Sequence, residues 1–137
     1  MGKLFLDTNV MLDLLGERAP YYQSAAQIAT LADKGQVKLV VSALSYATIF
    51  YLLSKYESSL LVKEKIRKFK ILAETADLSD EIIEKGLVSK FTDFEDALQY
   101  HCALTAEATI IITRNEKDFK ASALPVLKPD EYLKSRI

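Results

Sequence analysis

The sequence has very little of several residue types on which common functional sites depend. Its 137 residues include one cysteine, Cys102, and one histidine, His101, so no internal disulfide and no zinc-spaced cysteine–histidine cluster can form. Neighbouring side chains on a helix point about 100° apart, which also makes these two residues a poor catalytic pair. A single free cysteine fits a reducing compartment, and we expect the protein to be cytoplasmic.

Long apolar runs and an excess of one charge are absent as well. No apolar segment approaches the roughly 20 residues that a membrane helix needs, and no signal-peptide pattern opens the chain, so we expect no membrane partner. The formal net charge is −1, which argues against a generically basic nucleic-acid binder. Only four glycines are present, and there is no glycine-rich phosphate loop and no nucleophile elbow.

The residues that are present predict an α/β fold. With 50% hydrophobic and 27% charged residues, the chain is expected to form a single globular domain over residues 1–137. Short apolar runs predict strands, and longer patterns of helical spacing lie between them. The strands are expected at 4–6, 37–41, 71–75, 110–112 and 124–127, and the helices at 10–15, 21–33, 44–55, 61–69, 79–89 and 93–107. This alternation predicts a three-layer α/β/α domain with a central parallel sheet of about five strands.

Polar and acidic residues stand at the ends of elements that such a sheet would bring together. Asp7 follows the first strand, and Thr113 and Asn115 follow the isoleucine-rich strand. Asp93 and Asp96 lie three residues apart at a helix start and therefore share one face of the helix. Ligands collect outside the carboxyl ends of strands in open parallel sheets, so this edge is the expected functional site.

Each of these acids also has a purely structural interpretation. Asp7 could simply cap the helix that follows it, and acids in the first turn of a helix interact favourably with the helix dipole. Thr92-Asp93-Phe94-Glu95 has the pattern of a capping box, with Thr92 as the cap. Asp96 is different because it borders an apolar face, where an unpaired charge costs several kcal/mol. A divalent cation shared with Asp7 would give Asp96 the partner it needs.

Cationic residues are densest around the predicted helix 61–69. Lys63, Arg67 and Lys70 belong to this stretch. A basic run of this kind is usually a solvated helix face, and the alternative is a weak contact to the phosphate backbone of RNA. Arg114, directly after the isoleucine-rich strand, is a further candidate for RNA contact.

Taken together, the motifs resemble those of the PIN-domain family, the nuclease fold of VapC-like toxins. The matching segments are Leu6-Asp7-Thr8-Asn9-Val10 with Asp13, Asp93-Phe94-Glu95-Asp96-Ala97-Leu98, and Thr113-Arg114-Asn115 with Asp118-Phe119. The resemblance extends from Leu4 to about Leu133, and three motifs in this order and spacing are more specific than any one alone.

The resemblance implies an endoribonuclease that depends on Mg²⁺ or Mn²⁺ and that forms the toxin half of a toxin–antitoxin pair. Asp7 and Asp96 match the metal-binding and catalytic carboxylates of the family, with Asp93 as a third. The expected supporting residues are Asn9, Thr48, Thr113 and Asn115. The implied partners are an RNA substrate and a small antitoxin protein, and a homodimer is a further possibility, with the Leu/Tyr-rich helix 44–56 as its candidate contact.

Two positions depart from the family pattern. Relatives commonly carry a glutamate early in the helix after the second strand, where this sequence has Thr48 with Ser45 nearby, and many have an aspartate at the position of Asn115. Fewer carboxylate ligands predict weaker metal binding. The alternative function is therefore a catalytically weak or inactive PIN-like module that binds RNA or a protein. A third interpretation is a structural domain with surface acids only.

Overall fold

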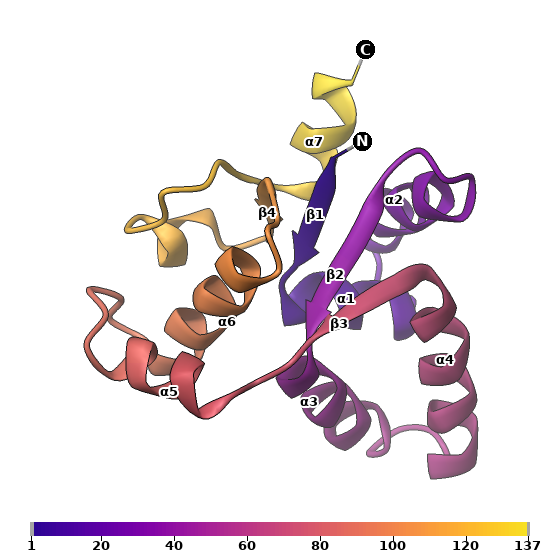
Figure 1. The fold of residues 1–137 in the computed structure, drawn as a ribbon. Helices are drawn as coiled ribbons and strands as arrows, with labels where there is room; N and C mark the ends of the chain where they lie inside the picture. The colour runs from indigo at the N-terminus through magenta and orange to yellow at the C-terminus, as the bar shows by residue number, and fades with distance from the viewer. Residues whose placement is uncertain (1, 137) are drawn as a thin grey trace.

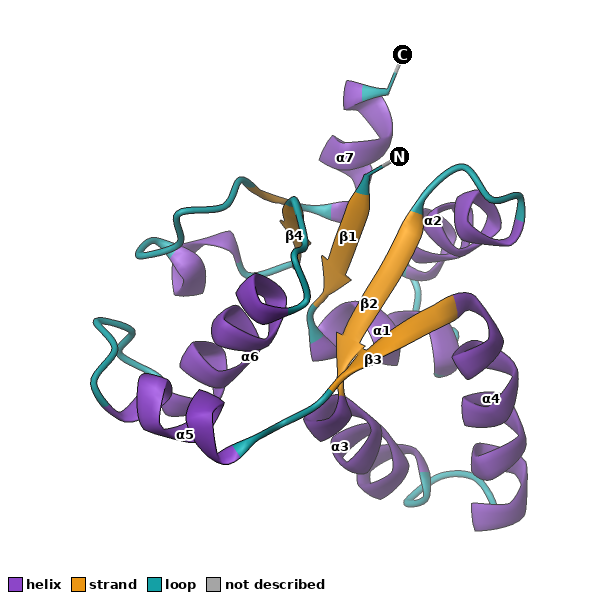
Figure 2. Cartoon of the chain, viewed as in Figure 1, coloured by secondary structure: helices purple, strands orange, loops and turns teal. Residues whose placement is uncertain are grey.

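The computed structural model describes residues 2–136 and has a parallel sheet at its centre. Its five strands lie in the order β3-β2-β1-β4-β5 (Figures 1 and 2). They are β1 (Lys3–Leu6), β2 (Lys38–Ser42), β3 (Ala73–Ala76), β4 (Ile110–Ile112) and β5 (Val126–Leu127). The helices are α1 (Thr8–Leu15), α2 (Tyr22–Asp33), α3 (Ala43–Leu53), α4 (Ser59–Leu72), α5 (Asp80–Leu87), α6 (Phe94–Thr105) and α7 (Pro129–Ser135), and a 3₁₀ turn spans Glu116–Phe119. The predicted α/β/α fold with a five-stranded parallel sheet is confirmed.

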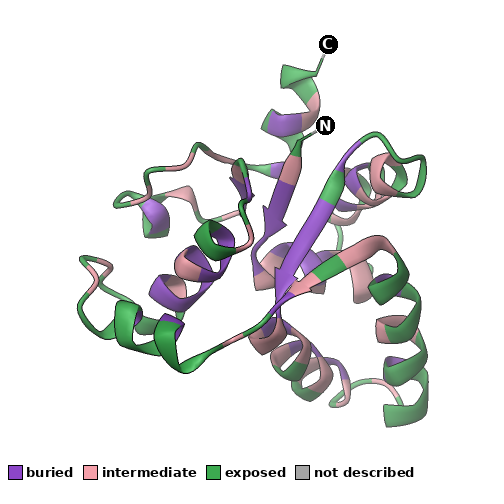
Figure 3. Ribbon diagram, in the orientation of Figure 1, coloured by how far each residue is buried: buried purple, intermediate pink, exposed green. Residues whose placement is uncertain are grey.

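Both faces of the sheet are covered by helices, which explains why the inner strands β1, β2 and β4 are apolar and buried over most of their length (Figure 3). The edge strand β3 has the sequence Ala-Glu-Thr-Ala and is partly exposed. In β1, Leu4 and Leu6 point into a core with α1, α2, α3, α4 and α7. Phe5 points to the other side, into a core with α5 and α6. All three side chains are buried, so a shift of register by one residue would exchange the contents of the two cores.

Strand β1 is central, and its pairing with β4 positions the candidate site. Leu6 aligns with Ile112, and the amide of Asp7 continues the ladder by donating to the carbonyl of Ile112 at 3.0 Å. Asp7 and Thr113 therefore leave the sheet side by side at its carboxyl edge. This is the edge at which the sequence predicted the site.

Several predicted boundaries were wrong. The strand expected at 71–75 begins at Ala73, because residues 71 and 72 are the last residues of α4. The capping residue of α6 is Asp93, whose Oδ1 accepts from the amide of Asp96 at 2.9 Å, whereas the sequence pattern favoured Thr92. Leu98 and Phe94 of α6 pack against Gly86 of α5, where the absence of a side chain allows the two helices to approach closely. Helix α6 accordingly begins one residue later than the capping pattern predicted. The helix predicted at 61–69 is longer, since Ser58 caps it by accepting from the amide of Leu61.

None of the helices within residues 2–136 has both the length and the apolar character needed to cross a membrane.

Candidate active site

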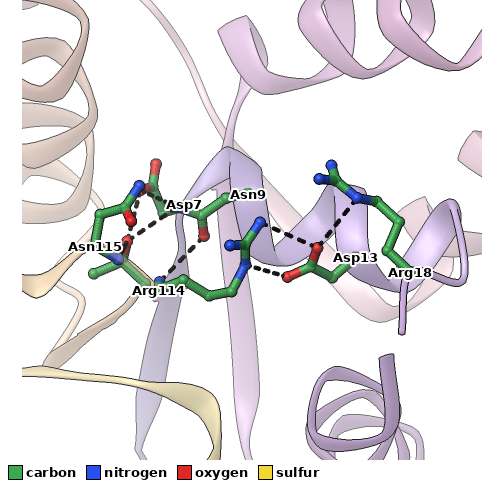
Figure 4. Close-up of polar contacts among 7 residues, drawn as sticks. Asp7, Asn9, Asp13, Arg18, Arg114 and Asn115 are labelled. Carbon is green, nitrogen blue, oxygen red and sulfur yellow. Dashed lines mark hydrogen bonds and ion pairs between the residues drawn. The ribbon is translucent and has the colours of Figure 1, made fainter. Parts of the chain in front are cut away.

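Asp7 is at once a helix cap and the centre of a buried hydrogen-bond network (Figure 4). Its Oδ1 accepts from the amide of Thr8 at 2.9 Å, which caps α1. Its Oδ2 accepts from the hydroxyl of Thr113 at 2.8 Å and from the side-chain amide of Asn9 at 3.3 Å. Only 7% of Asp7 is exposed, so these donors replace water around the carboxylate. The two interpretations of Asp7, as cap and as site residue, are compatible.

Thr113 holds this network together. Its hydroxyl donates to Asp7 and accepts from the Asn9 side chain at 3.3 Å and from the amide of Asn115 at 3.1 Å. The Asn9 carbonyl oxygen in turn accepts from the amide of Arg114 at 3.3 Å. Asn9 and Thr113 thus fix the orientation of the Asp7 carboxylate. Asn115 joins this network through its backbone amide, and the residue as a whole is exposed.

Asp96 lies within the electrostatic reach of Asp7. Burial raises the pKa of the Asp96 carboxyl to about 7, and the negative charges of Asp7, Asp93, Asp118 and Glu95 add to the increase. Burial also raises the pKa of Asp7, against the opposing effect of its hydrogen bonds from Thr113 and Thr8. Mutual repulsion of this kind is what a bound cation relieves. Asp118 and Glu95 are members of this acidic group that the sequence did not single out as site residues.

Asp93 has a structural task in the same group. One of its oxygens caps α6, and the residue is exposed. Within residues 2–136, no three or more His, Cys, Asp or Glu side chains are arranged so that they could hold a metal ion. The expected trio of Asp7, Asp93 and Asp96 is therefore not arranged as a metal cage in this structure.

The donor set nevertheless suits Mg²⁺ or Mn²⁺. Mg²⁺ typically keeps several waters and binds through one or two carboxylates together with substrate phosphate oxygens, so it does not require a cage of protein ligands. Asp7 and Asp96 supply two carboxylates whose charges interact, and the side chains that donate to Asp7 are the Thr113 hydroxyl and the Asn9 amide. Zinc and the softer metals prefer cysteine and histidine, which this site lacks.

At the position where the family resemblance led us to expect a glutamate, this chain has a network of hydroxyl groups. Ser45 on α3 lies 2.7 Å from the Thr8 hydroxyl, and the Gln99 side-chain amide on α6 donates to both, at 2.9 Å to Thr8 and 3.0 Å to Ser45. Thr48, one helical turn further on, donates to the carbonyl of Leu44 within its own helix. The neutral network fills the space between α1, α3 and α6 without adding charge. Gln99 was not predicted, although it follows Asp96 by one helical turn.

A second ion-pair system adjoins the first and was not anticipated. Asp13 is 1% exposed, and its carboxylate receives two hydrogen bonds from the Arg114 guanidinium, at 2.6 and 3.3 Å (Figure 4). Arg18 lies 3.7 Å from the same carboxylate, and the Arg114 guanidinium stacks over Tyr21 at 4.0 Å from the ring centroid. Arg114 is thus held rigidly next to the Asp7 network. The sequence contained both partners but no sign that they would pair.

The other predicted RNA contacts lie on α4, which packs against α3 and β3. Strand β3 is at the edge of the sheet, and β2 separates it from the central strand β1. The amino groups of Lys63 and Lys70 lie over the rings of Phe50 and Tyr46, and Arg67 pairs with Glu64. These cations are exposed along a helix face at the β3 edge of the sheet. Arg114 is the predicted cation that the structure places beside Asp7.

The raised pKa of Asp96 predicts a pH-dependent stability in the absence of metal. Between its ordinary value of 3.8 and about 7, the folded state holds this proton more tightly than the unfolded chain does. The contribution of Asp96 to stability therefore falls as the pH rises through this window. In EDTA, we expect the melting temperature of wild type to decrease more between about pH 5 and about pH 8 than the melting temperature of Asp96→Asn does. Equal pH profiles for the two proteins would show that Asp96 is not held in this acidic group.

Comparison with known proteins yields one family and a set of related structures. Residues 3–117 match the sequence profile of the family described as PIN domain. The chain is 27% identical over 135 residues to a protein named ribonuclease VapC1 from Aquifex aeolicus (strain VF5), and the match covers 95% of this chain and 92% of that protein.

Solved structures with a similar fold include chains of two bacterial complexes. A chain of a toxin–antitoxin complex from Klebsiella pneumoniae aligns with a TM-score of 0.68 and 22% identity, covering 92% of this chain and 97% of that one. A chain of VapBC-1 from nontypeable Haemophilus influenzae aligns with a TM-score of 0.68 and 18% identity, covering 93% and 98%. Each alignment spans nearly the whole of both chains, which shows that the fold is shared.

Proposed function

Because the chain belongs to the PIN-domain family, we propose that it is a Mg²⁺- or Mn²⁺-dependent endoribonuclease and the toxin of a toxin–antitoxin pair. The observation that carries the proposal is that Asp7 and Asp96 lie within electrostatic reach of each other at the carboxyl edge of the sheet, in one acidic group with Asp93, Asp118 and Glu95. The similarity to a ribonuclease along 95% of the chain supports the same reaction class.

In the proposed reaction, the side chains of the protein bind the metal ion and orient its ligands. Asp7 and Asp96 would hold the cation, and Thr113 and Asn9 keep the Asp7 carboxylate turned in one direction. A bound Mg²⁺ or Mn²⁺ would neutralise charge on the scissile phosphate and lower the pKa of a coordinated water. In the overall hydrolysis, water adds its oxygen to phosphorus and the 3′ oxygen leaves with a proton. The products are a 5′-phosphate and a 3′-hydroxyl end.

The proposal of an antitoxin partner rests on similar proteins whose structures were solved as complexes. The similar chains from Klebsiella pneumoniae and Haemophilus influenzae come from a toxin–antitoxin complex and from VapBC-1. We propose a small protein partner for this chain on that basis. Helix α3 remains the candidate homodimer contact, and Tyr51 on its surface is 65% exposed.

A specific observation favours a second candidate function. The position of the usual glutamate is taken by Thr48, whose hydroxyl is bonded to its own helix, and Asn115 presents no charge. A site with two interacting carboxylates binds metal more weakly than one with four. The second candidate is a PIN domain that binds RNA or a protein partner and cleaves slowly or not at all.

Metal removal tests the enzyme proposal against this alternative. We expect the purified protein to cleave a generic single-stranded RNA in the presence of Mn²⁺, to stop in EDTA, and to leave 5′-phosphate ends that a phosphate-dependent exonuclease can degrade. Cleavage that continues in EDTA, or that leaves cyclic phosphate ends, would contradict the proposed chemistry. RNA binding without any cleavage would favour the binding module.

A further inference from the structure

A hollow of about 470 Å³ opens next to the acidic site. It lies between the start of α2, the turn after β4 and the start of α7, and we call it the α2–α7 hollow. Its polar lining consists of Tyr21, Ser24, Arg114, Asn115, Lys128 and Asp130. Because Asn115 and Arg114 are also bonded to Thr113 and Asn9 through their backbone amides, the hollow adjoins the network that holds Asp7.

The charge in the α2–α7 hollow is opposite to that of the acidic site. Arg114 and Lys128 line it with one carboxylate, Asp130, so the cations in its lining outnumber the acids. The Lys128 amino group also lies 3.8 Å from the Glu116 carboxylate, in an exposed ion pair that water screens and that a phosphate can replace. Buried Asp13 forms ion pairs with both Arg114 and Arg18, so this group of three side chains carries a net positive charge. A polyanion approaching the acidic carboxylates is repelled unless cations lie beside its path. The hollow places such cations at the edge of the sheet where Asp7 stands.

The α2–α7 hollow also offers a planar surface. Tyr21 is 43% exposed, and the Arg114 guanidinium covers part of its ring at 4.0 Å from the centroid. Because Arg114 is fixed by two hydrogen bonds to Asp13, this stacked pair is rigid before any ligand arrives. Aromatic rings and guanidinium planes are the surfaces on which unpaired bases stack. The volume lies within the roughly 300–1,000 Å³ of small-molecule sites.

We propose that the α2–α7 hollow binds one nucleotide of single-stranded RNA adjacent to the cleaved phosphate, with its base against Tyr21 and its phosphate near Lys128 and Arg114. The inference rests on the proposed ribonuclease function and names where its substrate lies. It replaces the α4 cations as the expected RNA contact, because those lie at the β3 edge whereas the hollow lies where β4 and β5 end.

Binding of a fluorescein-labelled single-stranded RNA in EDTA, followed by anisotropy, tests this inference without any cleavage. We expect Tyr21→Ala to weaken binding by about tenfold and Tyr21→Phe to bind like wild type, because stacking needs only the ring. We expect Lys128→Gln to weaken binding and to reduce the slope of log K against log salt by about 0.7. Lys134→Gln on α7 is the matched control, and it should bind like wild type with an unchanged slope.

The outcomes separate this inference from the proposed function. If wild type cleaves RNA but Tyr21→Ala and Lys128→Gln change neither its affinity nor its KM, the hollow is not a substrate site and the ribonuclease proposal stands. If the variants weaken RNA binding in a protein that does not cleave, the hollow is an RNA site and the ribonuclease proposal falls. If Lys63→Gln and Lys70→Gln are the changes that weaken binding, the RNA lies along α4 and this inference is wrong. Variants that weaken only a complex with a protein partner would make the hollow a protein-docking surface, which also overturns it.

Discussion

Replacing Asp7 by asparagine is expected to lower the rate of Mn²⁺-dependent RNA cleavage by at least about 100-fold. The side chain keeps its size, but it no longer offers a negative oxygen to a cation. Asparagine also has one acceptor oxygen in place of two. Its NH2 group must therefore face either the Thr113 and Asn9 donors or the backbone amide of Thr8, and the side chain is no longer held in its native orientation. The measurement is initial cleavage rate against Mn²⁺ concentration for wild type and Asp7→Asn.

Asp33→Asn is the matched control for this substitution. Asp33 is exposed at the end of α2, so its replacement makes the same chemical change away from the candidate site. Melting temperatures of all three proteins should be recorded, since a folded Asp7→Asn protein separates lost chemistry from lost structure. Equal cleavage by wild type and Asp7→Asn would point to a contaminating nuclease and would remove the support for this site.

Replacing Asp13 by asparagine is expected to lower the free energy of unfolding by about 3 kcal/mol. The carboxylate is buried and accepts two hydrogen bonds from Arg114, so the variant leaves a partly buried guanidinium without its counter-charge. The side chain of Arg114 is only 22% exposed and cannot recover full hydration without leaving Tyr21. Urea denaturation followed by circular dichroism measures the loss.

The exposed pair of Arg67 and Glu64 on α4 provides the comparison. Both side chains are largely in water, so Arg67→Gln should cost about 0.5 kcal/mol or less. A double variant, Asp13→Asn with Arg114→Gln, should be more stable than the sum of its single changes predicts, because it removes both charges together. If Asp13→Asn costs no more than Arg67→Gln, the buried pair does not stabilise this end of the molecule.

The parts of the fold that were predictable from sequence are those with a local signal. Ile110-Ile111-Ile112 predicted a strand buried on both faces, and Leu4 to Leu6 predicted another, because short apolar runs of this length are typical of buried strands. That these two strands are neighbours is a finding of the structure, since the sequence predicted a parallel sheet but no strand order. Once the two strands are neighbours, Asp7 and Thr113 must stand together at its edge.

The parts that were not predictable depend on contacts between distant segments. Asp93 and Thr92 are both good capping residues, and the start of α6 also involves Phe94 and Leu98 packing where Gly86 lies on another helix. The pairing of Arg114 with Asp13 joins residues 101 positions apart and has no periodic signature. Gln99 entered the site because α6 lies beside Thr8 and Ser45, which no pattern within α6 reveals.

The hydrogen bond from Thr113 to Asp7 spans 106 positions of the chain, and it has a consequence for biosynthesis. A nascent polypeptide carries Asp7 out of the ribosome long before Thr113, which orients its carboxylate, has been translated. The acidic centre therefore cannot form on a growing chain until β4 has emerged and paired with β1.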